Sequence, residues 1–216
     1  MKLFRINKNL FYELEAYLIK NKLDSDKNSF LEIKNRLNNK IKLNPVEFAE
    51  EVIYVILVAG FSQKTAKKYF ELIVNGLRKG LCENEILKIF RNKNKISAIC
   101  KVWQNKEKLC AEFYKLKIVD EKISFLGKLP YIGEVTKYHL ARNLGLDFVK
   151  YDVWILRLAS HLYEKEYSNA KKACDKMFED LILETGEKRG YIDVVLWKAC
   201  QVGLIKFKNK RVSYEV

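Results

Sequence analysis

Two neighbouring stretches of the sequence decide its fold. The first is Leu129-Pro-Tyr-Ile-Gly133, and a helical pattern follows it from Glu134 to Leu144. The second is Tyr151-Asp-Val-Trp-Ile-Leu-Arg157. Proline restricts its own φ, and glycine readily takes a positive φ. The first stretch therefore predicts a tight turn, with Gly133 at positive φ, that opens a helix. The second predicts another helix with an acid at its start.

The start of the first helix is also a predicted anion site. The first N–H groups of a helix have no partner within it, and the helix dipole is positive there, so a phosphate binds well. Lys137 and Arg142 are expected to face solvent or that phosphate. Helical spacing predicts a buried stripe of Val135, His139, Leu140 and Leu144. Taken alone, the pattern is equally typical of an ordinary turn between two helices.

Together the two stretches resemble the helix-hairpin-helix superfamily of DNA glycosylases. The first is similar to the family hairpin Leu-Pro-Gly-Val/Ile-Gly. The second, extended to Leu158, is similar to the family signature Val-Asp-Thr-His-Val-x-Arg-(Leu/Val), with Asp152 and Arg157 in register. Asp152 lies 19 residues after Gly133, as the family suggests. The close match covers about residues 129–158.

Two residues depart from the family pattern. Tyr131 stands in place of the first hairpin glycine, and Trp154 stands in place of the usual histidine. These departures indicate a divergent branch of the superfamily, and they leave the preferred lesion open.

The resemblance implies an all-α fold with two helical lobes that flank a DNA-binding groove. Residues 1–216 would form a single glycosylase unit. The helix-hairpin-helix motif would span about residues 123–145, and the catalytic helix about residues 152–163. The residues implied to hold the DNA phosphate are Tyr131, Gly133, Val135 and Thr136.

Asp152 is the residue implied to be catalytic. When a base leaves its sugar, positive charge develops on the sugar, and a nearby carboxylate stabilises it. The same carboxylate can help to deprotonate the attacking nucleophile. An aspartate in this place is also a good helix cap. The residues alone favour the cap, the resemblance favours catalysis, and the two roles can coexist.

The sequence lacks the lysine that strand-cleaving members of the family carry two residues after the second hairpin glycine, because Val135 stands there. We therefore expect a monofunctional glycosylase that leaves an abasic site. A bifunctional glycosylase/lyase that uses Lys137 is one alternative, although Lys137 should point to a different face of the helix. A non-catalytic helix-hairpin-helix DNA-binding protein is the other, and the retained Asp152 argues against it.

The loop at residues 59–64 follows a predicted buried helix, as the wedge loop does in related enzymes. An enzyme that flips a base out of the duplex must fill the gap that it leaves. Phe61 or Gln63 is the candidate wedge, and Trp154 or Tyr131 could stack on the extruded base. The alternative is a plain helix–helix corner with Phe61 in the core.

The composition favours a polyanionic partner. The chain has 41 Lys+Arg against 27 Asp+Glu, and its formal net charge is +14. Lysines that neutralise phosphates release counterions and gain affinity, although a lysine-rich composition contributes to the charge as well. The expected partner is double-stranded DNA with a lesion, bound by a monomer.

Cysteine usage and hydropathy limit the other possibilities. The five cysteines form no CxxC pair, and only Cys174 and Cys200 follow Asp152, so we expect no iron–sulfur cluster. No cofactor is expected, and a monovalent cation at the hairpin is left open. The apolar run at residues 52–61 is too short to span a bilayer. A cytoplasmic protein without membrane association is expected.

Only 9 Gly and 2 Pro interrupt the chain, which favours long helices. Apolar spacing and cap residues predict further helices over residues 11–20, 30–43, 44–58, 63–77, 83–90, 95–115, 120–126, 168–185 and 191–202. Asn44, followed by Pro45, and Ser62 are the expected caps of the helices over 44–58 and 63–77. The tail at residues 205–216 is basic and alternating.

Overall fold

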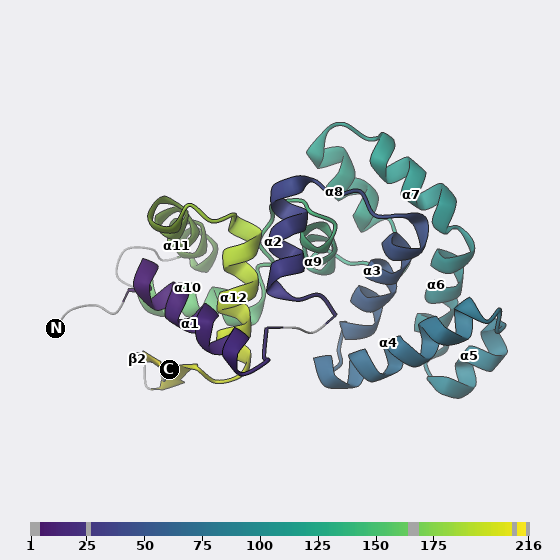
Figure 1. The fold of residues 1–216 in the computed structure, drawn as a ribbon, viewed down its shortest axis with the longest axis horizontal. Coiled ribbons are helices and arrows are strands. Elements are labelled where there is room, and N and C mark those ends of the chain that lie inside the picture. The colour runs from purple at the N-terminus through teal and green to yellow at the C-terminus, as the bar shows by residue number, and fades with distance from the viewer. Residues whose placement is uncertain (1–4, 25–26, 164–168, 209–210, 215–216) are drawn as a thin grey trace. The chain divides into compact units, whose positions relative to one another are not determined.

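The computed structural model describes residues 5–24, 27–163, 169–208 and 211–214 (Figure 1). Within them the chain forms twelve helices and one two-stranded sheet, so the predicted all-α class is confirmed. The elements are α1 (Lys8–Lys20), α2 (Phe30–Asn39), α3 (Pro45–Val58), α4 (Gln63–Arg78), α5 (Glu83–Ile89), α6 (Lys93–Gln104), α7 (Lys106–Lys115), α8 (Val119–Gly127), α9 (Thr136–Asn143), α10 (Val153–Tyr163), α11 (Ala170–Thr185), α12 (Arg189–Gln201), β1 (Ile205–Lys208) and β2 (Arg211–Tyr214). Among the described residues, no helix has the length and apolar character that a membrane span needs.

The chain divides into two compact units. One unit consists of residues 1–39 and 147–216, and the other of residues 40–146. The first unit therefore contains α1, α2, α10, α11, α12 and the two strands, whereas the second contains α3 to α9. Two helical units agree with the predicted two lobes. The groove between them, and the single glycosylase unit over residues 1–216, stay predictions.

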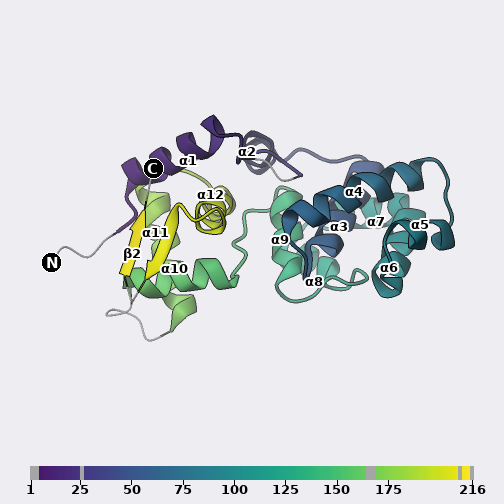
Figure 2. The same cartoon turned by 90° about the horizontal axis from the view of Figure 1, so that it is seen from below.

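The first unit is built around α12, which contacts α1, α2, α10 and α11. Ten of the thirteen residues of α12 are buried, so this helix forms the centre of the unit. Leu158 and Ala159 of α10 and Phe178 of α11 lie in the same core. The strands β1 and β2 pair antiparallel and contact α12 and α10 respectively (Figure 2). The tail was predicted to be basic and alternating, but no strands were predicted in it.

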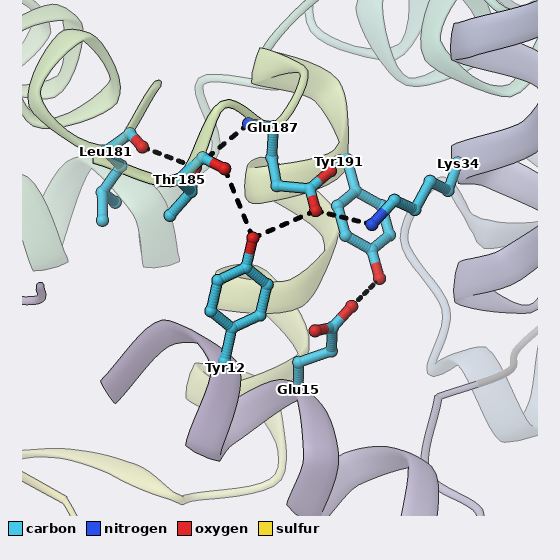
Figure 3. Close-up of polar contacts among 7 residues, drawn as sticks. All are labelled: Tyr12, Glu15, Lys34, Leu181, Thr185, Glu187 and Tyr191. Atoms are coloured by element: carbon cyan, nitrogen blue, oxygen red, sulfur yellow. Dashed lines mark hydrogen bonds and ion pairs between the residues drawn. The ribbon is translucent and has the colours of Figure 1, made fainter. Parts of the chain in front are cut away.

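A polar network joins the N-terminal helices to the turn between α11 and α12 (Figure 3). Glu187 Oε1 accepts from Lys34 Nζ of α2 at 2.5 Å and from the Tyr12 hydroxyl of α1 at 3.3 Å. The Tyr191 hydroxyl of α12 donates to Glu15 of α1. Burial raises the pKa of Tyr191, and the Glu15 carboxylate raises it further, so the phenol stays protonated and donates. Hydrogen bonds therefore fix α1 and α2 to a part of the chain more than 150 residues away.

The second unit is built around α3, which is buried over nine of its residues. Its start is a capping box, as the Asn44-Pro45 pair predicts. The Asn44 side chain accepts from the N–H groups of Val46 and Glu47, and the Glu47 carboxylate accepts from the Asn44 N–H at 2.9 Å. Further along α3, the buried Glu51 accepts from Asn143 Nδ2 of α9 at 3.1 Å. This bond holds the hairpin helix against the core of its unit.

Two predicted helices are wrong in extent. The helix predicted over residues 95–115 is two helices that meet at Asn105, whose φ is −106° and ψ 16°. The Asn105 side chain donates to the Lys101 carbonyl at 2.8 Å, and asparagine commonly competes with helical hydrogen bonding in this way. The helix predicted over residues 30–43 ends at Asn39, because Lys40 has a φ of +48°.

The position of α10 depends on its buried face, and one pair of substitutions tests this. Leu158→Ala removes a side chain with no exposed surface, so we expect the free energy of unfolding to fall by about 2–5 kcal/mol. Leu183→Ala makes the same change on α11, where the side chain is 83% exposed, and should change it by less than about 0.5 kcal/mol. Urea unfolding followed by circular dichroism measures both. Equal losses would contradict the core described above.

Candidate active site

The hairpin begins with a tight turn over residues 129–132. The Ile132 N–H donates to the Leu129 carbonyl at 3.1 Å, and Pro130 occupies the second position of the turn. Tyr131, in the third position, has a φ of +65°. A type II turn has proline in the second position and a positive φ in the third, where glycine is preferred. The prediction that Gly133 takes the positive φ is therefore wrong, since Tyr131 takes it.

The donors at the start of the hairpin helix lie one turn further on. Gly133 donates its N–H to Thr136 Oγ1 at 2.8 Å, and its carbonyl accepts from the Lys137 N–H at 3.0 Å. The helix α9 begins at Thr136, two residues later than predicted. Within the described residues, the N–H groups of Glu134, Val135 and Thr136 have no acceptor, so they are available to an anion. Gly133, predicted to hold the phosphate, has its own N–H occupied by Thr136.

Two side chains of this segment do not lie where the sequence predicts, and the contact of a third bears on the lyase alternative. Val135, predicted to be buried, is exposed, because it precedes the first turn of α9. Arg142, predicted to face solvent or phosphate, is buried with its neighbours on α9. Lys137 Nζ lies 2.6 Å from Glu134 Oε2, and this hydrogen bond raises the pKa of the lysine. A nucleophilic amine must be neutral, so the pairing opposes that role for Lys137.

The two carboxylate oxygens of Asp152 have different partners. Oδ1 accepts from the N–H groups of Trp154 at 3.0 Å and Ile155 at 3.2 Å, so Asp152 caps α10 as the sequence predicts. Oδ2 lies 3.3 Å from Lys150 Nζ. The Asp152 side chain is 12% exposed. A cation and the positive end of a helix therefore lie beside this carboxylate.

The turn that carries Asp152 is anchored from two neighbouring helices of its unit. The Lys150 N–H donates to Oδ2 of Asp193, a buried residue of α12, at 3.3 Å. The Tyr151 hydroxyl donates to Asp175 of α11, and burial raises the pKa of Tyr151. Sequence reasoning missed Asp175 and Asp193, because a contact over 24 or 43 residues leaves no local signal.

The candidate pocket and wedge residues have different surroundings. Trp154 stacks on Phe207 of β1, with ring centroids 6.2 Å apart, and the Arg157 guanidinium lies over both rings. One face of the indole is therefore covered. Phe61 is 40% exposed, which excludes the core position that was its alternative. Gln63 is the first residue of α4, and its side chain lies outside the described residues.

Lys95 is an unexpected feature of the second unit. Its side chain is 1% exposed, and Nζ donates to the carbonyls of Leu57 at 3.0 Å and Ala59 at 2.6 Å. Burial lowers the pKa of Lys95 to about 8. Apolar spacing gives no warning of this, because a lysine at the start of a helix is usually solvated.

Potential metal ligands do not cluster in the described part of the chain. No three His, Cys, Asp or Glu side chains there lie together as a metal site requires. Cys174 and Cys200 are buried, and burial raises the pKa of both thiols, that of Cys200 to about 12. Metal ligation uses the thiolate, which these surroundings disfavour.

The strain at Tyr131 can be measured with two variants. A positive φ costs a residue with a Cβ about 1–2 kcal/mol, and glycine avoids this cost. We expect the free energy of unfolding of Tyr131→Gly to be about 1 kcal/mol higher than that of Tyr131→Ala. Val135, with a φ of −85°, is the matched site, where the alanine variant should be the more stable. The same order at both positions would contradict the assignment of the strain.

The buried Lys95 predicts a pH dependence of stability. Its pKa is about 8 in the folded protein and 10.5 when exposed, so between these pH values the unfolded chain binds more protons. The free energy of unfolding contributed by Lys95 therefore rises with pH over this window. From pH 7.5 to pH 10, the free energy of unfolding measured in urea should rise more, or fall less, for the wild type than for Lys95→Met. The reverse difference would show that Lys95 is not desolvated.

No protein-family model matches this sequence, and no curated protein is similar to it. Solved structures do match. An 8-oxoguanine DNA glycosylase of Methanocaldococcus jannaschii is 20% identical over 90% of this chain and 93% of its own, with a TM-score of 0.65. An 8-oxoguanine glycosylase/lyase of the same organism, in complex with a 15mer DNA containing 8-oxoguanine, is 20% identical over 90% and 98%, with a TM-score of 0.60.

A third similar structure is the 8-oxoguanine DNA glycosylase of Thermotoga maritima, with 19% identity over 88% of this chain and 95% of that one, and a TM-score of 0.58. At such identities the likeness concerns the fold. Over about nine-tenths of its length, the chain has the all-α fold of the 8-oxoguanine DNA glycosylases.

Proposed function

We propose that this protein is a DNA glycosylase that excises a damaged or mismatched base in base excision repair, and that Asp152 is its essential carboxylate. The observation that carries the proposal is the position of Asp152 in this fold. It stands at the start of α10, with one oxygen in the helix cap and the other beside Lys150. A carboxylate that only capped the helix would need neither the cation nor the anchored turn before it.

The hairpin is the proposed contact with the DNA backbone. In the described part of the chain, the N–H groups of Glu134, Val135 and Thr136 have no acceptor. They lie at the positive end of α9, so they suit a phosphate oxygen. The net charge of +14 also supports a DNA partner, because cationic side chains that neutralise phosphates release counterions and gain affinity. A phosphate held there would fix the register of the strand without reading its sequence.

The proposed reaction breaks the bond between C1′ of the sugar and the nitrogen of the base. The bonding electrons leave with the base, and positive charge develops on the sugar ring. The Asp152 carboxylate stabilises this charge. A water molecule then attacks C1′ and loses a proton to the nearby carboxylate, and the net proton goes to the departing base, which leaves as an anion. The product is an abasic site in an intact strand.

Water is favoured over an amine as the nucleophile because the hairpin segment presents no neutral lysine. Val135 has no nucleophile, and Lys137 is hydrogen-bonded to Glu134, which raises its pKa. A glycosylase/lyase that uses Lys137 is the second candidate function, since one similar structure is described as a glycosylase/lyase. The same likeness makes 8-oxoguanine the first lesion to test.

Base release by Asp152→Asn tests the proposal directly. Asparagine caps a helix as well as aspartate does, so the fold should be kept while the charge is lost. We expect the rate of base release to fall at least about 100-fold. The assay follows duplexes with single lesions, beginning with 8-oxoguanine, and scores strand scission with and without hot alkali. Asp120→Asn, on the exposed start of α8, is the matched control.

The outcomes separate the candidates. Scission that needs alkali supports the monofunctional enzyme, whereas scission without alkali that is lost in Lys137→Gln supports the lyase. Full activity in Asp152→Asn would refute the role of this carboxylate. Tight, salt-sensitive duplex binding without release of any base would favour a non-catalytic DNA-binding protein.

A further inference from the structure

Two exposed aromatic rings lie over one buried cation in the unit of residues 40–146. Lys95 Nζ is 4.6 Å from the ring centroid of Phe61 and 5.5 Å from that of Tyr131. The lysine is 1% exposed, whereas Phe61 is 40% and Tyr131 46% exposed. The three residues come from the loop after α3, the start of α6 and the hairpin turn. Lys95 therefore connects the candidate wedge loop to the hairpin.

The cation is held from below by the end of α3. Its hydrogen bonds go to the carbonyls of Leu57 and Ala59, at the end of the helix where the dipole is negative. Phe61 is held as well, because its ring packs edge-on against Phe90 at 5.5 Å. An ammonium group close to an aromatic ring attracts it electrostatically. The rings are thus fixed in place while much of their surface stays open to solvent.

The backbone strain at Tyr131 indicates that this residue contacts a ligand. Its φ of +65° is strained for a residue with a Cβ, and a glycine there would avoid the strain. A large ring kept both strained and exposed gains little for the fold. Backbone strain of this kind often marks a functional site. The same turn precedes residues 134–136, whose N–H groups have no acceptor among the residues that the structure describes.

The chemistry that fits is a flat aromatic group attached to a phosphate. We propose that Phe61 and Tyr131, supported by the Lys95 ammonium, form a platform on which an unpaired nucleobase of the bound DNA stacks. The proposal rests on the proposed function, because extrusion of a base from a duplex leaves bases without a stacking or pairing partner. Trp154 is less suited, since Phe207 already covers one face of its ring.

Binding of a product analogue tests the platform without catalysis. The probe is a duplex with a tetrahydrofuran abasic analogue opposite 2-aminopurine, and its control is the same duplex fully paired. Stacking of a base on an aromatic ring contributes about 10- to 100-fold in affinity. Phe61→Leu and Tyr131→Gly should therefore bind the abasic duplex at least about tenfold more weakly, with a clearly smaller loss of affinity for the paired duplex. Tyr131→Gly removes the ring and the backbone strain together, so loss of folding is not expected.

A matched control and a second readout keep the proposal falsifiable. Tyr214→Leu, an exposed aromatic residue of β2, should leave both affinities unchanged. The 2-aminopurine emission in the saturated complex should be lower for the wild type than for either platform variant, since stacking quenches it. Lys95→Met should give an intermediate loss on the abasic duplex.

The results distinguish this proposal from the proposed function. Equal weakening on both duplexes, or no weakening on either, would overturn the platform even if the wild type excises a base. A wild type that binds the abasic duplex and stacks 2-aminopurine but releases no base would refute the glycosylase and leave the platform standing.

Discussion

The cap that Asp152 makes on α10 is the interaction on which the rest of the candidate site depends. Two backbone N–H groups fix one oxygen of the carboxylate, so the other oxygen has a defined direction. A free aspartate on a mobile loop would lose this orientation, and orientation is much of what a catalytic group contributes. The cap also explains how the residue proposed to be catalytic can be a structural necessity as well. Helix geometry and charge placement are satisfied by the same side chain.

The turn before the cap shows how the fold supports that side chain. Asp193 is a buried residue of α12, a helix that is almost wholly buried, and it accepts from the Lys150 N–H. Asp175 accepts from the neighbouring Tyr151 hydroxyl. The two residues that precede Asp152 are thus held by α12 and α11. A buried helix serves as the reference against which the turn is positioned.

Local signals predicted most of the helices, and distant contacts account for what was missed. Asn44 and Ser62 cap the helices that the sequence assigns to them, because a cap is made by residues only two or three positions apart. The break in the helix at Asn105 was missed, because the sequence pattern does not show that the Asn105 side chain donates to the Lys101 carbonyl. The environment of Lys95 depends on carbonyls 36 and 38 residues away, which no periodicity shows. The positive φ was assigned to Gly133 because glycine favours it, but the turn places Tyr131 in that position.

The division of the chain has a consequence for the order in which the protein is made. One unit is a single continuous segment, residues 40–146, whereas the other is assembled from both ends of the chain. During synthesis the continuous unit can fold as soon as it has left the ribosome, since domains generally fold as units. The helices α1 and α2 must wait for α12, which leaves the ribosome after the whole of the continuous unit. A premature stop between α10 and α12 would therefore leave a folded unit of residues 40–146 attached to exposed apolar helices, without the scaffold that holds Asp152.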